Sequence, residues 1–161
     1  MRSDDGNTRA LFVCTANVCR SPMAEAIFNA LAEERGVSWR AKSAGVAALV
    51  GEGISPRAGA ALEEVGVFAE GHRARQVDAR MLERADLVLA MTRTHADTLL
   101  RLSPQASTKV HTLMTFVGDF GEGTDIPDPY GQSMTAHRAS VRQLLRYLEA
   151  LVERVKVGNG M

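Results

Sequence analysis

A cysteine and an arginine stand with five residues between them in the segment Cys14-Thr15-Ala16-Asn17-Val18-Cys19-Arg20-Ser21, and this pair could do chemistry on a phosphate group. A thiolate is a strong nucleophile, and a helix N-terminus or a nearby guanidinium favours the thiolate over the thiol. A guanidinium also presents a planar fork of N–H donors that matches two phosphate oxygens. The spacing therefore predicts that Cys14 attacks the phosphorus of a phosphate that Arg20 holds.

The residues on each side of this loop predict how its backbone is positioned. The apolar run 10–13 predicts a buried strand, and Ser21 as N-cap with Pro22 as the first residue predicts a helix that ends at Gly36. A loop between a strand and a helix can turn successive N–H groups toward one point, where the helix dipole favours an anion. We expect the Ser21 hydroxyl to donate to the Cys14 sulfur. Phosphate would be bound by the N–H groups of Thr15, Ala16, Asn17, Val18 and Cys19.

The rest of the chain has the pattern of alternating strands and helices after a loose leader, residues 1–8. The further strands are expected over 37–43, 86–91 and 109–113. The further helices are expected over 55–66, 78–84, 94–102 and 133–156, and the segment 116–130 is expected to be mostly loop. This alternation predicts one α/β domain over 1–161, with a parallel sheet and helices on both faces. Ligands bind at the carboxyl ends of strands in such sheets, and Cys14 lies at one such end.

Composition limits the classes of partner. The 161 residues contain 45% hydrophobic residues, and 19 Lys and Arg balance 19 Asp and Glu. A neutral chain lacks the broad positive field of nucleic-acid-binding proteins, so we expect no nucleic-acid partner. No apolar run approaches the roughly 18 residues that span a bilayer, and the polar N-terminus has no signal-peptide core. We therefore expect no membrane association and a cytoplasmic location.

Cys14 and Cys19 are the two cysteines of the chain. Two close cysteines do not make a disulfide framework, which favours a reducing compartment. No second Cys/His pair at ligand spacing accompanies them, so we expect no zinc site.

The run LFVCTANVCRSPMAEAIF resembles the signature of the low-molecular-weight protein tyrosine phosphatase family. Three later segments match that family in the same order: Ser43-Ala44-Gly45, Gly71-His72-Arg73-Ala74-Arg75-Gln76 and Asp128-Pro129-Tyr130. The resemblance extends from about Leu11 to Val155. It implies a flavodoxin-like domain with a four-stranded parallel sheet, and neither a metal nor an organic cofactor.

The resemblance also implies roles for individual residues at the reacting centre. Cys14 is the nucleophile, and Arg20 binds the phosphate and the transition state. Asp128 is the general acid that protonates the leaving group and later activates water. Asp125 is the rival candidate for this acid, and we favour Asp128 because it directly precedes Pro-Tyr.

Further roles follow from the same resemblance. Asn17 holds the loop in a strained conformation, within a hydrogen-bond network that also contains Ser21, Ser43 and His72. Cys19 could trap an oxidised Cys14 as a disulfide and so protect it from irreversible oxidation. The alternative is that Cys19 is a small packing residue.

The kind of phosphate is left open between two branches of the family. Tyr130 would form one wall of the cleft and stack on an aromatic substrate, but the opposing segment 46–50 has no aromatic residue. The segments 89–92 and 109–113 are similar to a bacterial branch that removes phosphate from protein arginine. Val18, however, is apolar as in the tyrosine branch. We therefore predict a phosphotyrosine substrate, with phosphoarginine as the alternative.

Two other classes of function share this fold and loop. An arsenate reductase would pass oxidation to further cysteines, and none follows Cys19. A non-catalytic phosphate-binding module would need no thiol chemistry. For the phosphatase, we expect inorganic phosphate, vanadate and arsenate to be competitive inhibitors.

Overall fold

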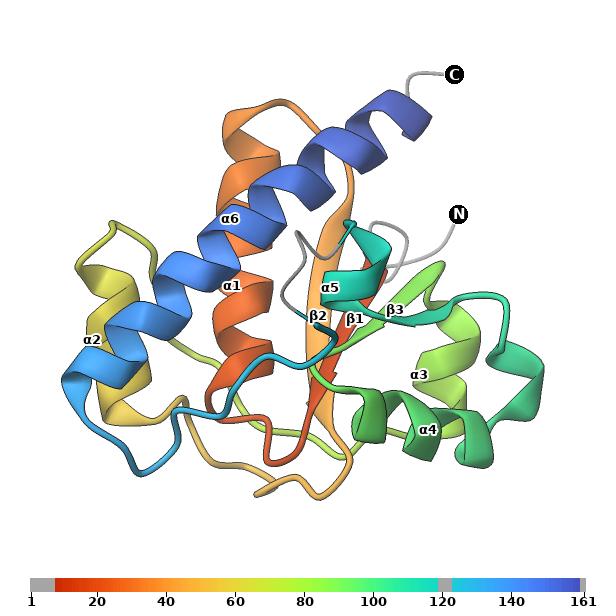
Figure 1. Ribbon diagram of the computed structural model, residues 1–161, viewed down its shortest axis with the longest axis horizontal. Coiled ribbons are helices and arrows are strands. Elements are labelled where there is room, and N and C mark those ends of the chain that lie inside the picture. The colour runs from red at the N-terminus through yellow and green to blue at the C-terminus, as the bar shows by residue number, and fades with distance from the viewer. Residues whose placement is uncertain (1–7, 119–122, 160–161) are drawn as a thin grey trace.

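A computed structural model describes residues 8–118 and 123–159 (Figure 1). Four parallel strands form the sheet in the order β2-β1-β3-β4. They are β1 (Thr8–Cys14), β2 (Arg40–Gly45), β3 (Leu87–Ala90) and β4 (Val110–Thr112). The predicted leader falls on residues 1–7, which lie outside the described residues, and on Thr8, where the prediction is wrong because Thr8 pairs with Arg40 in the sheet.

Helices cover both faces of this sheet, as the α/β pattern predicts. The helices are α1 (Arg20–Glu34), α2 (Pro56–Glu63), α3 (Ala79–Arg84), α4 (Arg93–Leu102), α5 (Leu113–Phe116) and α6 (Met134–Asn159), with a 3-10 turn at Pro104–Ala106. On one face α1 packs against β1 and β2, and α6 and α2 pack behind it. On the other face α3 lies on β1, and α4 lies on β3 and β4 (Figure 1).

The central strands are apolar because they are buried on both faces. All four residues of β3 are buried, and so are residues 10–14 of β1. Parallel strands between two helical layers have this composition. The apolar runs therefore predicted both strands correctly.

Several element boundaries differ from the predicted ones. The first helix begins at Arg20 with Cys19 as N-cap, so the prediction of Ser21 as N-cap is wrong. The N–H of Met23 already bonds to the carbonyl of Cys19, and Pro22 is accommodated because N–H groups in a first turn have no helical partner. The second strand starts at 40 rather than 37, because pairing with β1 begins there.

The loops that follow β1, β2 and β3 meet at the carboxyl ends of these strands. The chain passes from β1 to β2 on one side, and returns to place β3 on the other side of β1. Ligands in doubly wound sheets bind at such a switch point, at the carboxyl ends of the strands. Cys14 ends β1 there, beside Gly45 at the end of β2.

Among the helices of residues 8–118 and 123–159, none is both long and apolar enough to cross a membrane. Within the same residues, no group of three or more His, Cys, Asp or Glu side chains could hold a metal ion.

Candidate active site

The loop from Cys14 to Cys19 has its carbonyl groups bound from outside. The carbonyl oxygens of residues 14, 15, 16 and 18 accept hydrogen bonds from the N–H groups of Val46, Ala47, Leu49 and Ser55, at 2.9, 2.9, 3.1 and 2.9 Å. Within one trans peptide unit the carbonyl and the next N–H point in opposite directions. The N–H groups of residues 15, 16, 17 and 19 therefore face the inside of the loop, and so does that of Val18, because the Asn17 carbonyl is bound from outside by His72. None of these five N–H groups has a backbone acceptor among the described residues. Converging N–H groups of this kind form an anion site.

Asn17 gives the loop its shape. Its φ is 62°, and among the described residues it is the one non-glycine residue with positive φ. Its Nδ2 donates to Oγ of Ser21 at 2.8 Å and to Oγ of Ser43 at 3.0 Å, while its Oδ1 accepts from the Arg75 N–H at 3.0 Å. Asparagine tolerates the left-handed region better than most residues. Bonds from three separate segments hold it there.

Ser21 contacts the sulfur of Cys14 as the sequence predicts. The two atoms are 2.9 Å apart, and the Ser21 oxygen already accepts a hydrogen bond from Asn17. The single hydroxyl proton is therefore available to the sulfur, since the other acceptor, the Ala44 carbonyl, is farther away at 3.4 Å. A donor in this position stabilises a thiolate more than a thiol.

The remaining members of the predicted network also lie beneath the loop. Nε2 of His72 lies 2.8 Å from the carbonyl oxygen of Asn17, and because a carbonyl only accepts, Nε2 carries the proton. Ser43 donates to Oε1 of Glu25 at 2.6 Å. The structure thus brings together the four predicted residues, and adds two that the sequence analysis missed, Glu25 and Arg75. Both stand inside segments that carry the family resemblance.

Arg20 is buried at 5% exposure and reaches across to the segment before α6. Its Nη1 donates to the Ile126 carbonyl at 3.0 Å, and its Nη2 lies 3.4 Å from Oδ2 of Asp128. Its Nε has no hydrogen-bond acceptor among the described residues. A buried donor without an acceptor is costly, so Arg20 is suited to an anionic ligand.

Asp128 and its rival Asp125 have different surroundings. Asp125 accepts from the N–H of Arg93 at 2.8 Å, where it stabilises the start of α4. Asp128 is half exposed, accepts from the N–H of Tyr130 at 3.1 Å, and faces the loop. A cavity of about 140 Å³ is lined by residues 14–20 together with Asp128 and Tyr130. Asp125 does not line this cavity.

The walls of the cavity differ in polarity. Val18 is buried in its floor, and Tyr130 stands exposed on one side. In the loop that follows β2, Leu49 and Val50 expose apolar side chains. Neither of these two residues lines the cavity.

A further contact to the loop comes from His95 at the start of α4. Its Nε2 lies 2.8 Å from Oγ1 of Thr15, and its Nδ1 lies 3.0 Å from Oγ1 of Thr92. Burial, helped by the positive charge of Arg20, lowers the pKa of His95 to about 4, so the ring is neutral at neutral pH. The sequence analysis missed His95, since one histidine on an amphipathic helix carries no signal of its own.

Cys19 is a free, buried thiol whose sulfur lies 3.0 Å from Oγ of Ser55. Burial raises the pKa of the Cys19 thiol to about 11, so it is protonated at neutral pH. Its pairing with Cys14 stays a prediction.

Comparison with known proteins shows which family and which relatives this chain resembles. The family model described as low molecular weight phosphotyrosine protein phosphatase matches residues 9–159. A protein-arginine-phosphatase of Bacillus subtilis (strain 168) is 37% identical over 146 residues, which cover 91% of this chain and 95% of that protein. A low molecular weight protein-tyrosine-phosphatase of Streptomyces coelicolor is 41% identical over 128 residues, which cover 76% of this chain and 77% of the relative.

Solved structures agree with these relatives. The crystal structure of a low molecular weight protein tyrosine phosphatase from T. tengcongensis superposes with a TM-score of 0.86 at 40% identity. The match covers 91% of this chain and 99% of that one. The fold, the loop and the family match over residues 9–159 lead to one conclusion: the chain belongs to the low molecular weight phosphotyrosine protein phosphatase family, whose members are hydrolases.

Proposed function

We propose that the chain hydrolyses phosphotyrosine in proteins through a phosphocysteine intermediate. The observation that carries the proposal is Arg20, a buried guanidinium whose Nε has no acceptor among the described residues, and which borders the same cavity as Cys14 and Asp128. A phosphate in that cavity would supply acceptor oxygens to this guanidinium and to the inward N–H groups of the loop.

In the first step, the Cys14 sulfur forms a bond to phosphorus while the bond from phosphorus to the tyrosine oxygen breaks. Asp128 gives its proton to that oxygen, so that tyrosine leaves as the neutral phenol. Ser21 and the loop N–H groups stabilise the thiolate before attack and again when it leaves.

In the second step, Asp128 removes a proton from water, and the water oxygen attacks phosphorus. The bond between sulfur and phosphorus then breaks, which returns Cys14 as the thiolate and releases inorganic phosphate. Neither step in this scheme uses a metal or an organic cofactor.

The test is hydrolysis of p-nitrophenyl phosphate by the wild type and by Cys14→Ser, with Cys19→Ser as the matched control at the other cysteine. We expect Cys14→Ser to lose activity by several orders of magnitude and Cys19→Ser to keep most of it. Equal rates for wild type and Cys14→Ser, or no hydrolysis by either, would leave the non-catalytic phosphate-binding function.

Phosphoarginine is the second candidate substrate. It is supported by the identity to the protein-arginine-phosphatase of Bacillus subtilis over 91% of the chain. The exposed Tyr130 and the apolar Val18 at the cavity favour phosphotyrosine instead. Hydrolysis of matched phosphotyrosine and phosphoarginine peptides decides between them, through the ratio of kcat/KM.

Inorganic phosphate, vanadate and arsenate would compete with substrate, because each is an oxyanion that the loop and Arg20 can hold. Indifference to all three would contradict an open anion site.

The two free cysteines are in keeping with a reducing, cytoplasmic location and with one phosphatase domain that needs no disulfide.

A further inference from the structure

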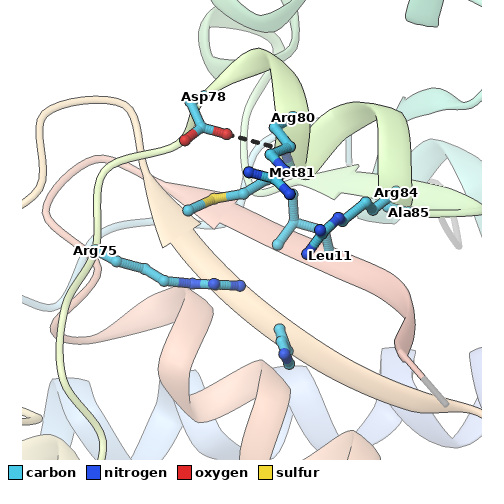
Figure 2. Close-up of a pocket in the computed structure, with 8 residues that line it drawn as sticks. Leu11, Arg75, Asp78, Arg80, Met81, Arg84 and Ala85 are labelled. Carbon is cyan, nitrogen blue, oxygen red and sulfur yellow. Dashed lines mark hydrogen bonds between the residues drawn. The ribbon is translucent and has the colours of Figure 1, made fainter. Parts of the chain in front are cut away.

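Two of the cavities outside the catalytic site differ in their relation to it. One, of about 270 Å³, lies between α3 and strand β1 (Figure 2) and shares no lining residue with the cavity at the phosphate loop. The other, of about 440 Å³ and here called the α2–α6 cavity, is lined by Ser55, Pro56, Arg57, Tyr130, Gly131 and His137. Tyr130 is a wall of this cavity and of the catalytic cavity alike. The α2–α6 cavity is thus in position to contact the part of a substrate next to its phosphate.

Three segments meet at the α2–α6 cavity. Helix α2 and the start of α6 lie side by side (Figure 1). In the turn that precedes α6, the N–H of Gln132 donates to the Pro129 carbonyl at 2.9 Å, and the Gln132 carbonyl accepts from Nη1 of Arg57 at 3.2 Å. The N–H of Ser55 donates to the Val18 carbonyl at 2.9 Å. Hydrogen bonds therefore hold this cavity in a fixed position relative to the phosphate loop.

His137 presents an unused hydrogen-bonding atom to this cavity. The residue is 2% exposed, and its Nδ1 lies 2.8 Å from the carbonyl oxygen of Ser133. Because a carbonyl only accepts, Nδ1 carries a proton, and Nε2 of the neutral ring is an acceptor. Nε2 has no partner within residues 8–118 and 123–159, yet it is not among the unpartnered atoms that are fully enclosed there. A buried polar atom without a partner is costly, so Nε2 is suited to a donor that enters the cavity.

The other walls favour an aromatic side chain. Tyr130 is 54% exposed and offers its ring, Pro56 adds apolar surface, and Arg57 is an exposed cation at the same cavity. Aromatic rings pack well against one another, and a guanidinium over a ring face adds cation–π attraction. The volume lies within the usual range for ligand pockets, about 300–1,000 Å³. An aromatic ring with an O–H or N–H at its edge therefore matches both the walls and Nε2.

We propose that the α2–α6 cavity binds an aromatic side chain of the protein substrate, and that His137 recognises a hydrogen-bond donor on that side chain. The inference rests on the proposed hydrolysis of phosphotyrosine in proteins. The occupant is a tyrosine or tryptophan within two positions of the phosphotyrosine, because the two cavities share one wall and an extended peptide advances only about 3.3 Å per residue.

The experiment compares phosphotyrosine peptides in an alanine host. Each peptide has Tyr, Phe or Ala at one position, from two before the phosphotyrosine to two after it, and phosphate release gives kcat/KM. At one of these positions we expect the order Tyr, Phe, Ala. Tyr should exceed Phe by roughly 2–10-fold, the effect of a single hydrogen bond. This comparison uses the wild type and needs no variant to fold.

His137→Phe removes the acceptor and should reduce the ratio of kcat/KM for the Tyr peptide over the Phe peptide to about one. The preference for Phe over Ala should remain. His111→Phe is the matched control, because His111 lies on β4 and lines neither cavity, and it should keep the wild-type ratio. The ratio cancels any uniform loss of activity in a variant.

Equal kcat/KM for the Tyr and Phe peptides at all four positions would overturn the proposal, and so would an unchanged ratio in His137→Phe. Hydrolysis of p-nitrophenyl phosphate and of the Ala peptides distinguishes this result from a failure of the proposed function. Both reactions persist in the wild type if only the aromatic subsite is wrong. Absence of either from the wild type contradicts the hydrolysis of phosphotyrosine itself.

Discussion

Oδ2 of Asp128 lies 3.4 Å from Nη2 of Arg20, so the proposed proton donor and the proposed phosphate ligand border one small cavity. Asp125, three positions earlier in the chain, is bound to the backbone of Arg93 instead. The two carboxylates thus differ in their contacts: Asp128 lies against Arg20 at the cavity, whereas Asp125 accepts from the backbone of Arg93.

Replacement of Asp128 should therefore affect turnover. Asp128→Ala is expected to lower kcat for a phosphotyrosine peptide by about 10²–10⁴-fold, the usual contribution of general acid catalysis. The inhibition constant for vanadate should change far less. Asp125→Ala is the matched control and should mainly lower stability. A larger loss of kcat in Asp125→Ala would show that the acid has been assigned wrongly.

Gly45 should not accept a side chain. A Cβ at this position would lie 2.4 Å from the carbonyl oxygen of Thr15 and 3.1 Å from the backbone N of Asn17. Gly45→Ala must therefore move the phosphate loop, and we expect at least a tenfold loss of kcat/KM and weaker vanadate binding. Gly59→Ala on α2 is the control, because its Cβ would meet only the Ile54 side chain at 3.4 Å. Unchanged kinetics in Gly45→Ala would contradict the rigid loop.

Val18 should influence the choice of substrate. Val18→Thr would place a hydroxyl in the floor of the cavity, where it could hydrogen-bond a guanidinium. One such bond contributes about 0.5–1.5 kcal/mol, so the ratio of kcat/KM for phosphoarginine over phosphotyrosine peptides should rise roughly 2–10-fold. The same ratio in Val18→Ala controls for the loss of volume. A rise of equal size in Val18→Ala would exclude the hydroxyl as the cause.

Stability should depend on pH through His95. Its pKa is about 4 in the folded protein and 6.5 without the surrounding structure, so between these values the unfolded state binds a proton that the folded state excludes. Stability that is present above pH 6.5 is therefore lost as the pH falls toward 4, by roughly 3 kcal/mol at most. Urea unfolding at pH 7 and 4.5 should show a smaller decrease in His95→Gln than in the wild type. Equal decreases would contradict this assignment.

Disulfide formation by Cys19 should be slow at neutral pH. With a pKa of about 11, Cys19 is a thiolate in roughly one molecule in 10⁴ at pH 7. If it traps an oxidised Cys14, the rate of disulfide formation after peroxide treatment should rise about tenfold between pH 7 and pH 8. Mass spectrometry of the two cysteines measures this rate, with Cys19→Ala as the blank. A rate independent of pH would show that Cys19 does not react as a free thiolate.

The parts of this site that are local in sequence could be predicted. The spacing from Cys14 to Arg20, the strand before it and the helix after it all lie within one segment, and each has a pattern of its own. The contact of His95 with Thr15 spans 80 residues, and it depends on where α4 begins over the sheet. Packing of this kind has no local pattern in the sequence.

Helix and strand boundaries show the same limit. Ser21 has the residue type of an N-cap, but the helix begins one residue after Cys19 because the Cys19 carbonyl accepts the first helical bond. This shift leaves the Ser21 side chain directed at the Cys14 sulfur rather than at the helix start. A local propensity was overridden by the contact that the loop requires.

The octapeptide 14–21 does not determine the shape of its loop alone. Asn17 takes its backbone conformation from bonds to Ser43 and Arg75, and to a histidine 55 positions later in the chain. An octapeptide transplanted into the strand–helix junction of an unrelated scaffold would relax, and its N–H groups would no longer point toward one site. To transfer this chemistry to another scaffold, a designer must transfer the supporting residues Ser43, His72 and Arg75 together with the loop.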